Sequence, residues 1–214
     1  MINLRTQGEM DIIAHGGSII GQCHAELARR IVPGVSTGEI DAFVEEFIVG
    51  HDGAIPAFKG LYGFPGSACI SVNEEVVHGI PSTKRVLNEG EIVSVDIGVR
   101  LEGWYSDSAR TFAVGEVSAE ARVLLDVTTR SLDAAMEACV PGNHVGDIGA
   151  AVIKTCEGTN YGIIRELVGH GVGRELHEQP QVPNYRSEEH TSELQSLTNL
   201  GCRLLLEKRG GGGG

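Results

Sequence analysis

One stretch of the sequence, Ile92-Val93-Ser94-Val95-Asp96-Ile97-Gly98-Val99, alternates apolar residues with small or polar ones. This period of two predicts a β-strand with one apolar face and one polar face. A turn centred on Leu101-Glu102, eased by the glycine that follows, leads into a second strand over residues 104–112. With the turn at that place, Asp96 lies directly opposite Asp107 on the polar face of a β-hairpin.

Two carboxylates directly opposite each other form a like-charge pair, which destabilises a sheet. Three arrangements would remove that cost. The carboxylates share a proton, which raises the pKa of one of them, or a cation lies between their oxygens. Alternatively, a β-bulge shifts the register by one residue and turns one carboxylate to solvent. The pair alone leaves all three arrangements open.

Histidines in glycine-rich surroundings add nitrogen donors to this set. His170 lies between glycines in the run 169–173, His177 follows seven residues later, and His78 precedes Gly79. Glycines allow backbone or a ligand to come close, although a single histidine is more often a structural residue. Two carboxylates with an imidazole suit manganese, iron, cobalt or zinc better than calcium.

Four motifs that contain these residues occur in a fixed order along the chain. They are His78-Gly79-Ile80-Pro81, Val95-Asp96-Ile97-Gly98, Asp107-Ser108-Ala109-Arg110-Thr111-Phe112, and Gly169-His170-Gly171-Val172-Gly173 through His177-Glu178-Gln179-Pro180. From the N-terminus to about Tyr185 the sequence resembles the type I, bacterial-type methionine aminopeptidases of the M24 peptidases. The resemblance implies an α+β, pita-bread (creatinase/aminopeptidase) fold and removal of the initiator methionine from nascent proteins.

The resemblance also implies a role for each matching residue. Asp96, Asp107 and His170 match metal ligands, with Asp107 bridging two divalent ions (cobalt, manganese, iron or zinc). His78 and His177 match catalytic histidines that contact the substrate and stabilise the transition state. The segment from Phe58 to Cys69 matches the wall of the pocket for the methionine side chain, and an aromatic and thiol lining suits a thioether. Within this segment, Leu61 replaces the more usual aromatic residue.

Two other classes of protein share this fold and remain as alternatives. One is an Xaa-Pro aminopeptidase or prolidase, which usually carries an extra N-terminal domain. The other is a non-catalytic pita-bread binding protein, which has typically lost the ligands that this sequence retains. For the aminopeptidase, the resemblance implies nascent polypeptide N-termini and the ribosome as partners, a cytoplasmic location and a monomeric state.

The C-terminal residues depart from the family pattern. The family has two further glutamate ligands, one of them in a Thr-x-Glu-Pro-like strand, and neither motif occurs here. Residues 186–196 and 202–208 resemble a translated sequencing adapter, and five glycines end the chain. We therefore expect a truncated catalytic domain over residues 1–185 and an adapter-like, non-native, disordered tail over residues 186–214. This polypeptide is expected to be weak or inactive.

An internal repeat predicts a pseudo-two-fold domain. Val32-Pro33-Gly34 recurs as Val140-Pro141-Gly142, an offset of 108 residues, and repeated spacing indicates repeated structural units. The same offset puts the counterpart of the hairpin from about residue 199 onward, so the second half is expected to be incomplete. The pattern predicts helices over 6–31, from 36 onward, 119–139 and 147–157, and strands over 68–72, 92–99, 105–114 and 163–168.

Composition excludes several classes of partner. A net charge of −12 on 214 residues argues against binding to nucleic acid or to an anionic membrane, which both require a basic surface. No apolar run reaches transmembrane length. Five cysteines without Cys-x-x-Cys spacing indicate reduced thiols rather than a disulfide framework.

Overall fold

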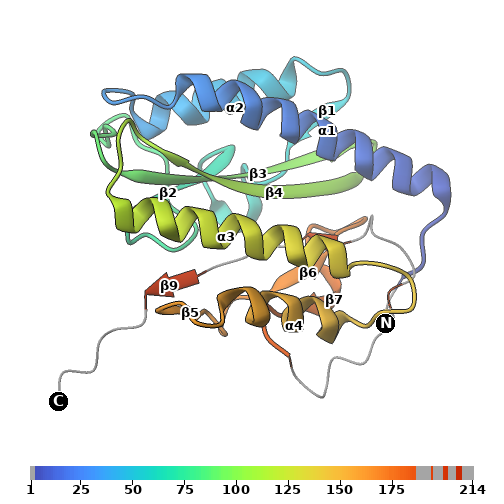
Figure 1. Cartoon of the computed structure of the whole chain (residues 1–214). Helices are drawn as coiled ribbons and strands as arrows, with labels where there is room; N and C mark the ends of the chain where they lie inside the picture. The colour runs from blue at the N-terminus through green and yellow to red at the C-terminus, as the bar shows by residue number, and fades with distance from the viewer. Residues whose placement is uncertain (1–2, 187–193, 195–199, 202–205, 209–214) are drawn as a thin grey trace. The chain divides into compact units, whose positions relative to one another are not determined.

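The computed structural model describes residues 3–186, 194, 200–201 and 206–208, and it divides into two compact units. The first, here called the hairpin unit, comprises Leu4–Ala119 together with Val172–His177. The second, here called the C-terminal unit, comprises Glu120–Gly171 and Glu178–Gly214 together with the first three residues. Figure 1 shows the elements of both units along the chain.

The hairpin unit consists of two helices and a four-stranded antiparallel sheet. Strands β1 and β2 pair with one edge of β3, and β4 pairs with the other edge. Figure 1 shows α1 and α2 together on one side of this sheet. The elements are α1 (Gln7–Arg30), α2 (Thr37–Val49), β1 (Ala54–Pro56), the 3-10 helix η1 (Leu61–Gly63), β2 (Ala68–Val72), β3 (Ile92–Leu101) and β4 (Trp104–Ala113).

Both helices of this unit begin at capping boxes. The Thr6 backbone N–H donates to the Glu9 carboxylate at 2.8 Å, and the Ser36 N–H donates to the Glu39 carboxylate at 2.8 Å. In each box the side chain of the first residue accepts the backbone N–H of the glutamate, so two helix-terminal donors are satisfied at once. The predicted helix starts are therefore confirmed. No helix in the described part of the chain is long and apolar enough to cross a membrane.

The apolar face of β3 forms the centre of the hairpin unit. Val93, Val95, Ile97 and Val99 are completely buried, as the alternation predicts. They belong to one cluster with apolar residues of both helices and of β2: Ile19, Ile20, Leu27, Ile40, Val44, Ile48, Ile70 and Val72. The opposite face of the sheet carries the small and polar residues of the alternation.

The register of the hairpin differs from the prediction. Its turn is centred on Glu102 and Gly103, which have φ values of 51° and 81°, as a two-residue turn of the I′ type requires. Asp107 therefore pairs with Gly98, two residues beyond Asp96. The prediction that the two aspartates lie directly opposite each other is wrong. Because a shift of two residues preserves the face, they remain diagonal neighbours on the same polar face.

The C-terminal unit contains a second helix pair and short strands. In it β6 pairs with both β7 and β8, and β5 pairs with β9. Its described elements are α3 (Ala119–Ala138, with its first residue in the hairpin unit), α4 (Val145–Cys156), β5 (Tyr161–Ile163), β6 (Gly169–Gly171), β7 (Glu178–Val182), β8 (Leu200–Gly201) and β9 (Leu206–Lys208).

The predicted strand over residues 163–168 is wrong in most of its length, because β5 ends at Ile163 and β6 begins only at Gly169. Between them the backbone N–H of Arg165 donates to the carboxylate of its neighbour Glu166 at 3.2 Å. Such a local bond takes a backbone donor that a strand would pair with its neighbour. The remaining strand and helix predictions agree with the structure to within a few residues.

The internal repeat is present in the helix pairs. Helices α1 and α3 end at Arg30 and Ala138, and α2 and α4 begin at Thr37 and Val145, so both pairs of positions are 108 residues apart. The glycines that precede α2 and α4 in the repeated motif both have left-handed backbone, with φ of 98° and 93°. The helix pair is thus the repeated unit that the sequence predicts.

Leu194 contradicts the expectation that residues 186–214 lie wholly outside the core. Leu194 is 6 % exposed, and it belongs to a cluster with Val127, Ile148 and Val182 in the C-terminal unit. Its backbone N–H donates to the Asn143 carbonyl oxygen at 2.7 Å. Residues 187–193, 195–199, 202–205 and 209–214 lie outside the described residues, so the proposed boundary at residue 185 stays a prediction.

Gly98 has no room for a side chain, and this generates a first prediction. A Cβ atom added at Gly98 would lie 2.5 Å from Cε1 of Phe58 and 2.9 Å from Cβ of Ala57. Overpacking of this kind usually costs about 1–3 kcal/mol, so we expect Gly98→Ala to lower the free energy of unfolding by that amount in urea denaturation. Gly17→Ala on α1 is the control, because its Cβ would meet nothing within 4 Å. Equal destabilisation by both substitutions would contradict the prediction.

His24 links the stability of the hairpin unit to pH. His24 is 4 % exposed, and its Nε2 lies 3.1 Å from the Ser108 carbonyl oxygen, to which it donates because a carbonyl can only accept. Burial lowers the pKa of His24, the bond to Ser108 partly offsets this, and the charge of Arg110 lowers the pKa further. The unfolded chain therefore binds the proton more readily than the folded chain. The stability that neutral His24 provides is complete above about pH 6.5 and is lost as the pH falls toward the lowered folded-state pKa.

We therefore expect His24→Gln to reduce the acid sensitivity of the fold, because glutamine keeps a donor for Ser108 but does not titrate. The measurement is the urea midpoint at pH 7.5 and at pH 5.5. The unsubstituted protein should lose more stability between these values than the His24→Gln variant. His15→Gln, on the exposed side of the same helix, should behave as the unsubstituted protein does. Identical pH dependence in all three proteins would rule out this role for His24.

Candidate metal and substrate site

The polar face of the sheet brings both predicted carboxylate ligands together. Asp96 is 5 % exposed and pairs directly with Cys69 of β2, whereas Asp107 is half-buried and pairs with Gly98. Residues paired directly across antiparallel strands share a face, so these four lie on one surface of the sheet. Carboxylate oxygens suit a divalent cation, and the thiol gives this surface an apolar border.

His78 follows β2 on a loop that is held against the strand. The Gly79 carbonyl oxygen accepts the Ile70 N–H at 2.9 Å, and the Gly79 N–H donates to the Ser71 hydroxyl at 3.0 Å. A Cβ at Gly79 would lie 2.0 Å from the Ile70 oxygen, so only glycine fits here. His78 itself is exposed and has a φ of 60°, a left-handed conformation that costs a non-glycine residue about 1–3 kcal/mol.

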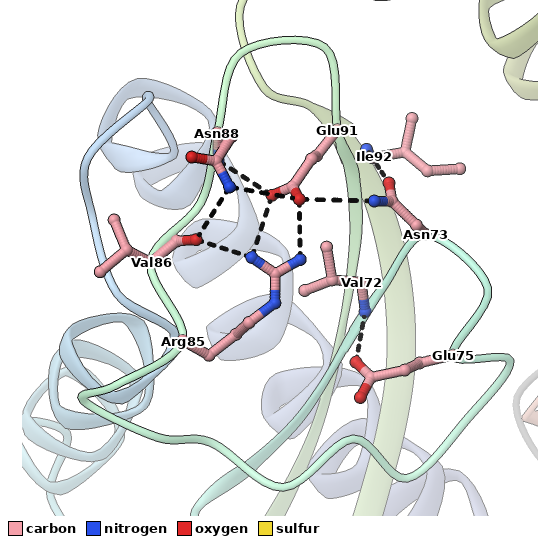
Figure 2. Close-up of polar contacts among 8 residues, drawn as sticks. All are labelled: Val72, Asn73, Glu75, Arg85, Val86, Asn88, Glu91 and Ile92. Carbon is pink, nitrogen blue, oxygen red and sulfur yellow. Dashed lines mark hydrogen bonds and ion pairs between the residues drawn. The ribbon is translucent and has the colours of Figure 1, made fainter.

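Figure 2 shows how the base of this loop is closed around the Glu91 carboxylate. Both terminal nitrogens of Arg85 donate to this carboxylate, at 3.2 and 2.8 Å, and the backbone N–H of Asn88 donates to it at 2.9 Å. The side-chain oxygen of Asn73 accepts the backbone N–H of Ile92 at 3.0 Å. Because the bonds from Arg85 favour the charged carboxylate, they lower the pKa of Glu91. The chain is thereby fastened where it leaves β2 and where it enters β3.

His177 comes to the same unit on the segment Val172–His177. The Gly173 carbonyl oxygen accepts the Tyr105 N–H of β4 at 2.8 Å. The guanidinium carbon of Arg174 lies 4.0 Å from the centroid of the Trp104 ring, within the range of a cation–π interaction. These contacts attach the segment to the start of β4. His177 follows them directly and is exposed.

An apolar cluster adjoins the carboxylates. Phe58, Cys69 and Leu176 are all buried and form one cluster, which links the residue before His177 to the residue opposite Asp96. Four partly buried residues pack against this cluster: Ala57, Leu61, Phe64 and Tyr105. The segment from Phe58 to Cys69 was expected to wall a substrate pocket, but sequence reasoning missed Leu176. Its position directly before His177 was the available signal.

His170 lies on β6 in the C-terminal unit, where the strand register is irregular. Its Nδ1 is 3.0 Å from the carbonyl oxygen of Gly171. A carbonyl can only accept, so Nδ1 carries the proton in this bond, and Nε2 carries the lone pair of the neutral ring. A histidine that ligates a metal is oriented in this manner. The expected approach of His170 to Asp96 and Asp107 stays a prediction, because these residues belong to different units.

The donor types of Asp96, Asp107 and His170 suit a divalent metal ion. The hairpin unit by itself contributes only the two carboxylates of this set. Carboxylate oxygens with an imidazole nitrogen suit the borderline divalent ions. Among the described residues, no group of three or more His, Cys, Asp or Glu side chains is placed to hold a metal ion. A catalytic ion usually takes three protein ligands. The Asp96–Asp107 pair therefore requires a further donor.

Comparison with known sequences identifies the family. The model of metallopeptidase family M24 matches residues 11–199. The methionine aminopeptidase of Clostridium acetobutylicum and methionine aminopeptidase 1 of Bacillus subtilis are each 46 % identical over 185 residues, covering 86 % of this chain and 74 % of the relative. The methionine aminopeptidase of Escherichia coli K12 is 36 % identical over 188 residues, covering 88 % and 71 %.

Comparison with solved structures supports the same assignment. The methionine aminopeptidase of Thermotoga maritima superposes with a TM-score of 0.91 at 37 % identity, covering 96 % of this chain and 82 % of that one. The prolidase of Pyrococcus furiosus superposes at 0.81 with 23 % identity, covering 96 % and 58 %, which shows the fold alone. The expected α+β pita-bread fold is confirmed. This chain belongs to metallopeptidase family M24 and, within it, to the bacterial-type methionine aminopeptidases.

Proposed function

We propose that this protein removes the initiator methionine from the N-termini of nascent polypeptides. The observation that carries the proposal is the apolar cluster of Phe58, Cys69 and Leu176, which lies beside the buried carboxylate of Asp96. Aromatic and sulfur-containing surroundings suit the flexible thioether of methionine. A peptide whose first side chain enters this cluster presents its first peptide bond to the carboxylate face. His177 is exposed and directly follows Leu176, so we expect its imidazole to reach that bond.

The family is one of metallopeptidases, which implies the use of divalent metal ions. Asp96, Asp107 and His170 would hold them, and we propose two ions drawn from cobalt, manganese, iron and zinc. When bound, such an ion supplies a Lewis acid and acidifies a water molecule. His78 and His177 donate hydrogen bonds to the substrate and to the negative charge that develops on its carbonyl oxygen.

The cellular setting follows from this substrate. Nascent N-termini emerge at the ribosome in the cytoplasm, so we propose a cytoplasmic enzyme that acts there as a monomer. The net charge of −12 disfavours binding of its own to nucleic acid or to an anionic membrane. The rival activity, cleavage of Xaa-Pro peptides, is that of proteins with the same fold, among them the prolidase of Pyrococcus furiosus.

The activity is tested with purified protein, added cobalt or manganese, and two peptides, Met-Ala-Ser and an Xaa-Pro peptide. We expect methionine release from Met-Ala-Ser alone, at a low rate, because only three side chains match the family's ligands. His177→Ala should lower the rate by about 10²–10³-fold. Preferential cleavage of the Xaa-Pro peptide would favour the prolidase class. Metal binding without cleavage of either peptide would favour a non-catalytic binding protein.

Metal binding provides a separate test by calorimetry. We expect the unsubstituted protein to bind cobalt or manganese weakly. Asp107→Asn should bind the same ion more weakly by at least about 10–100-fold, because the loss of a residue that only hydrogen-bonds to a metal ligand already costs this much affinity. Asp126→Asn is the matched control, since this exposed carboxylate on α3 pairs with Arg130 at 2.9 Å. Equal affinity in all three proteins would exclude Asp107 as a ligand.

A further inference from the structure

We infer that Ser71 is a positioning residue, which acts through Gly79 to hold His78 in place. The inference rests on the role proposed above for His78. Ser71 lies in β2 on the polar face of the sheet and is 3 % exposed. Its hydroxyl accepts the buried N–H of Gly79 at 3.0 Å, although eight residues separate the two along the chain.

The bond restrains the peptide that His78 itself forms. The N–H of Gly79 belongs to the His78–Gly79 peptide group, and the Gly79 carbonyl oxygen accepts the Ile70 N–H at 2.9 Å. Gly79 is therefore held on both sides by consecutive residues of one strand. A peptide group attached in this way cannot rotate without breaking a buried hydrogen bond, which is unfavourable.

The backbone of His78 needs such a restraint. Its φ of 60° is unfavourable for a residue with a side chain, and conformations of this kind persist only where the surroundings enforce them. His78 is exposed, whereas Gly79 is buried. The restraint on the backbone of His78 thus comes from the buried neighbour and from Ser71, while the imidazole stays accessible to a peptide substrate.

Ser71 differs in this respect from Ser94, its direct cross-strand partner. Ser94 lies on the same face, and its hydroxyl is 2.7 Å from the hydroxyl of Thr111 in β4. That hydrogen bond stays within the sheet, whereas the bond of Ser71 reaches the loop that carries His78. The two serines therefore form a matched pair, of which only one should influence the catalytic histidine.

The first arm of the test measures the restraint directly. Amide hydrogen exchange at Gly79, followed by NMR, should be at least about 10-fold faster in Ser71→Ala than in the unsubstituted protein, because the N–H loses its acceptor. It should be unchanged in Ser94→Ala. Ser71→Thr, which retains a hydroxyl, should restore slow exchange. Equal exchange in Ser71→Ala and Ser94→Ala would overturn the inference, whether or not the protein releases methionine.

The second arm measures the consequence for catalysis. Ser71→Ala should lower kcat for Met-Ala-Ser by about 10–100-fold, because a small misplacement of a catalytic group costs this much, and Ser94→Ala should leave kcat within about 2-fold of the unsubstituted value. In a His78→Ala background, Ser71→Ala should have no further effect on kcat. Fully additive losses would overturn the inference, because Ser71 would then act independently of His78. If exchange at Gly79 depends on Ser71 as expected but the protein releases no methionine, the proposed function is wrong, whereas the restraint of Gly79 by Ser71 is established.

Discussion

The turn at Glu102 and Gly103 determines the arrangement of the hairpin unit. Both residues have positive φ, which matches the twist of the two strands and pairs Leu101 with Trp104. Every other pair of the hairpin, down to Ile92 with Ala113, follows from that one. A slip of one residue would exchange the two faces of β3. It would expose the valines that α1 and α2 cover and bury the carboxylates among apolar side chains, at a large electrostatic cost.

The same register limits the repulsion between the carboxylates of Asp96 and Asp107 even without a bound ion. Asp96 pairs with Ala109 and Asp107 pairs with Gly98, so neither carboxylate has another directly opposite. Diagonal neighbours in a sheet are roughly 7–8 Å apart, and at that distance like charges repel less than they would as a direct pair. The hairpin therefore forms without a shared proton, a cation between the carboxylates or a β-bulge. The diagonal spacing still leaves both oxygen donors on one surface.

Local rules predicted the helix starts and the faces of β3, but they did not determine the register of the hairpin, the local bond at Arg165 or the packing of residues far apart in sequence. The helix starts near Thr6 and Ser36 and the alternation in β3 are visible within a few residues of sequence. Moving the turn by one residue, from 101–102 to 102–103, shifts the strand pairing by two residues and leaves every side chain on the same face. The alternation alone therefore could not distinguish pairing of Asp107 with Asp96 from pairing with Gly98. Leu176 shares a cluster with Phe58, and Leu194 shares one with Val127. These residues are far apart in sequence, so no local periodicity predicts that they pack together. The left-handed backbone of His78 is likewise imposed by its surroundings.

Both candidate catalytic histidines in the hairpin unit stand on loops, yet each is fixed by main-chain bonds to the sheet. Gly79 bonds to β2 beside His78, and Gly173 bonds to β4 shortly before His177. Loops attached to a rigid sheet hold side chains more precisely than free loops do. Since β2 and β4 both pair with β3, the positions at which these loops attach depend on the register of β3. The constraint that places the carboxylates on one face therefore also decides where the two histidines are attached around them.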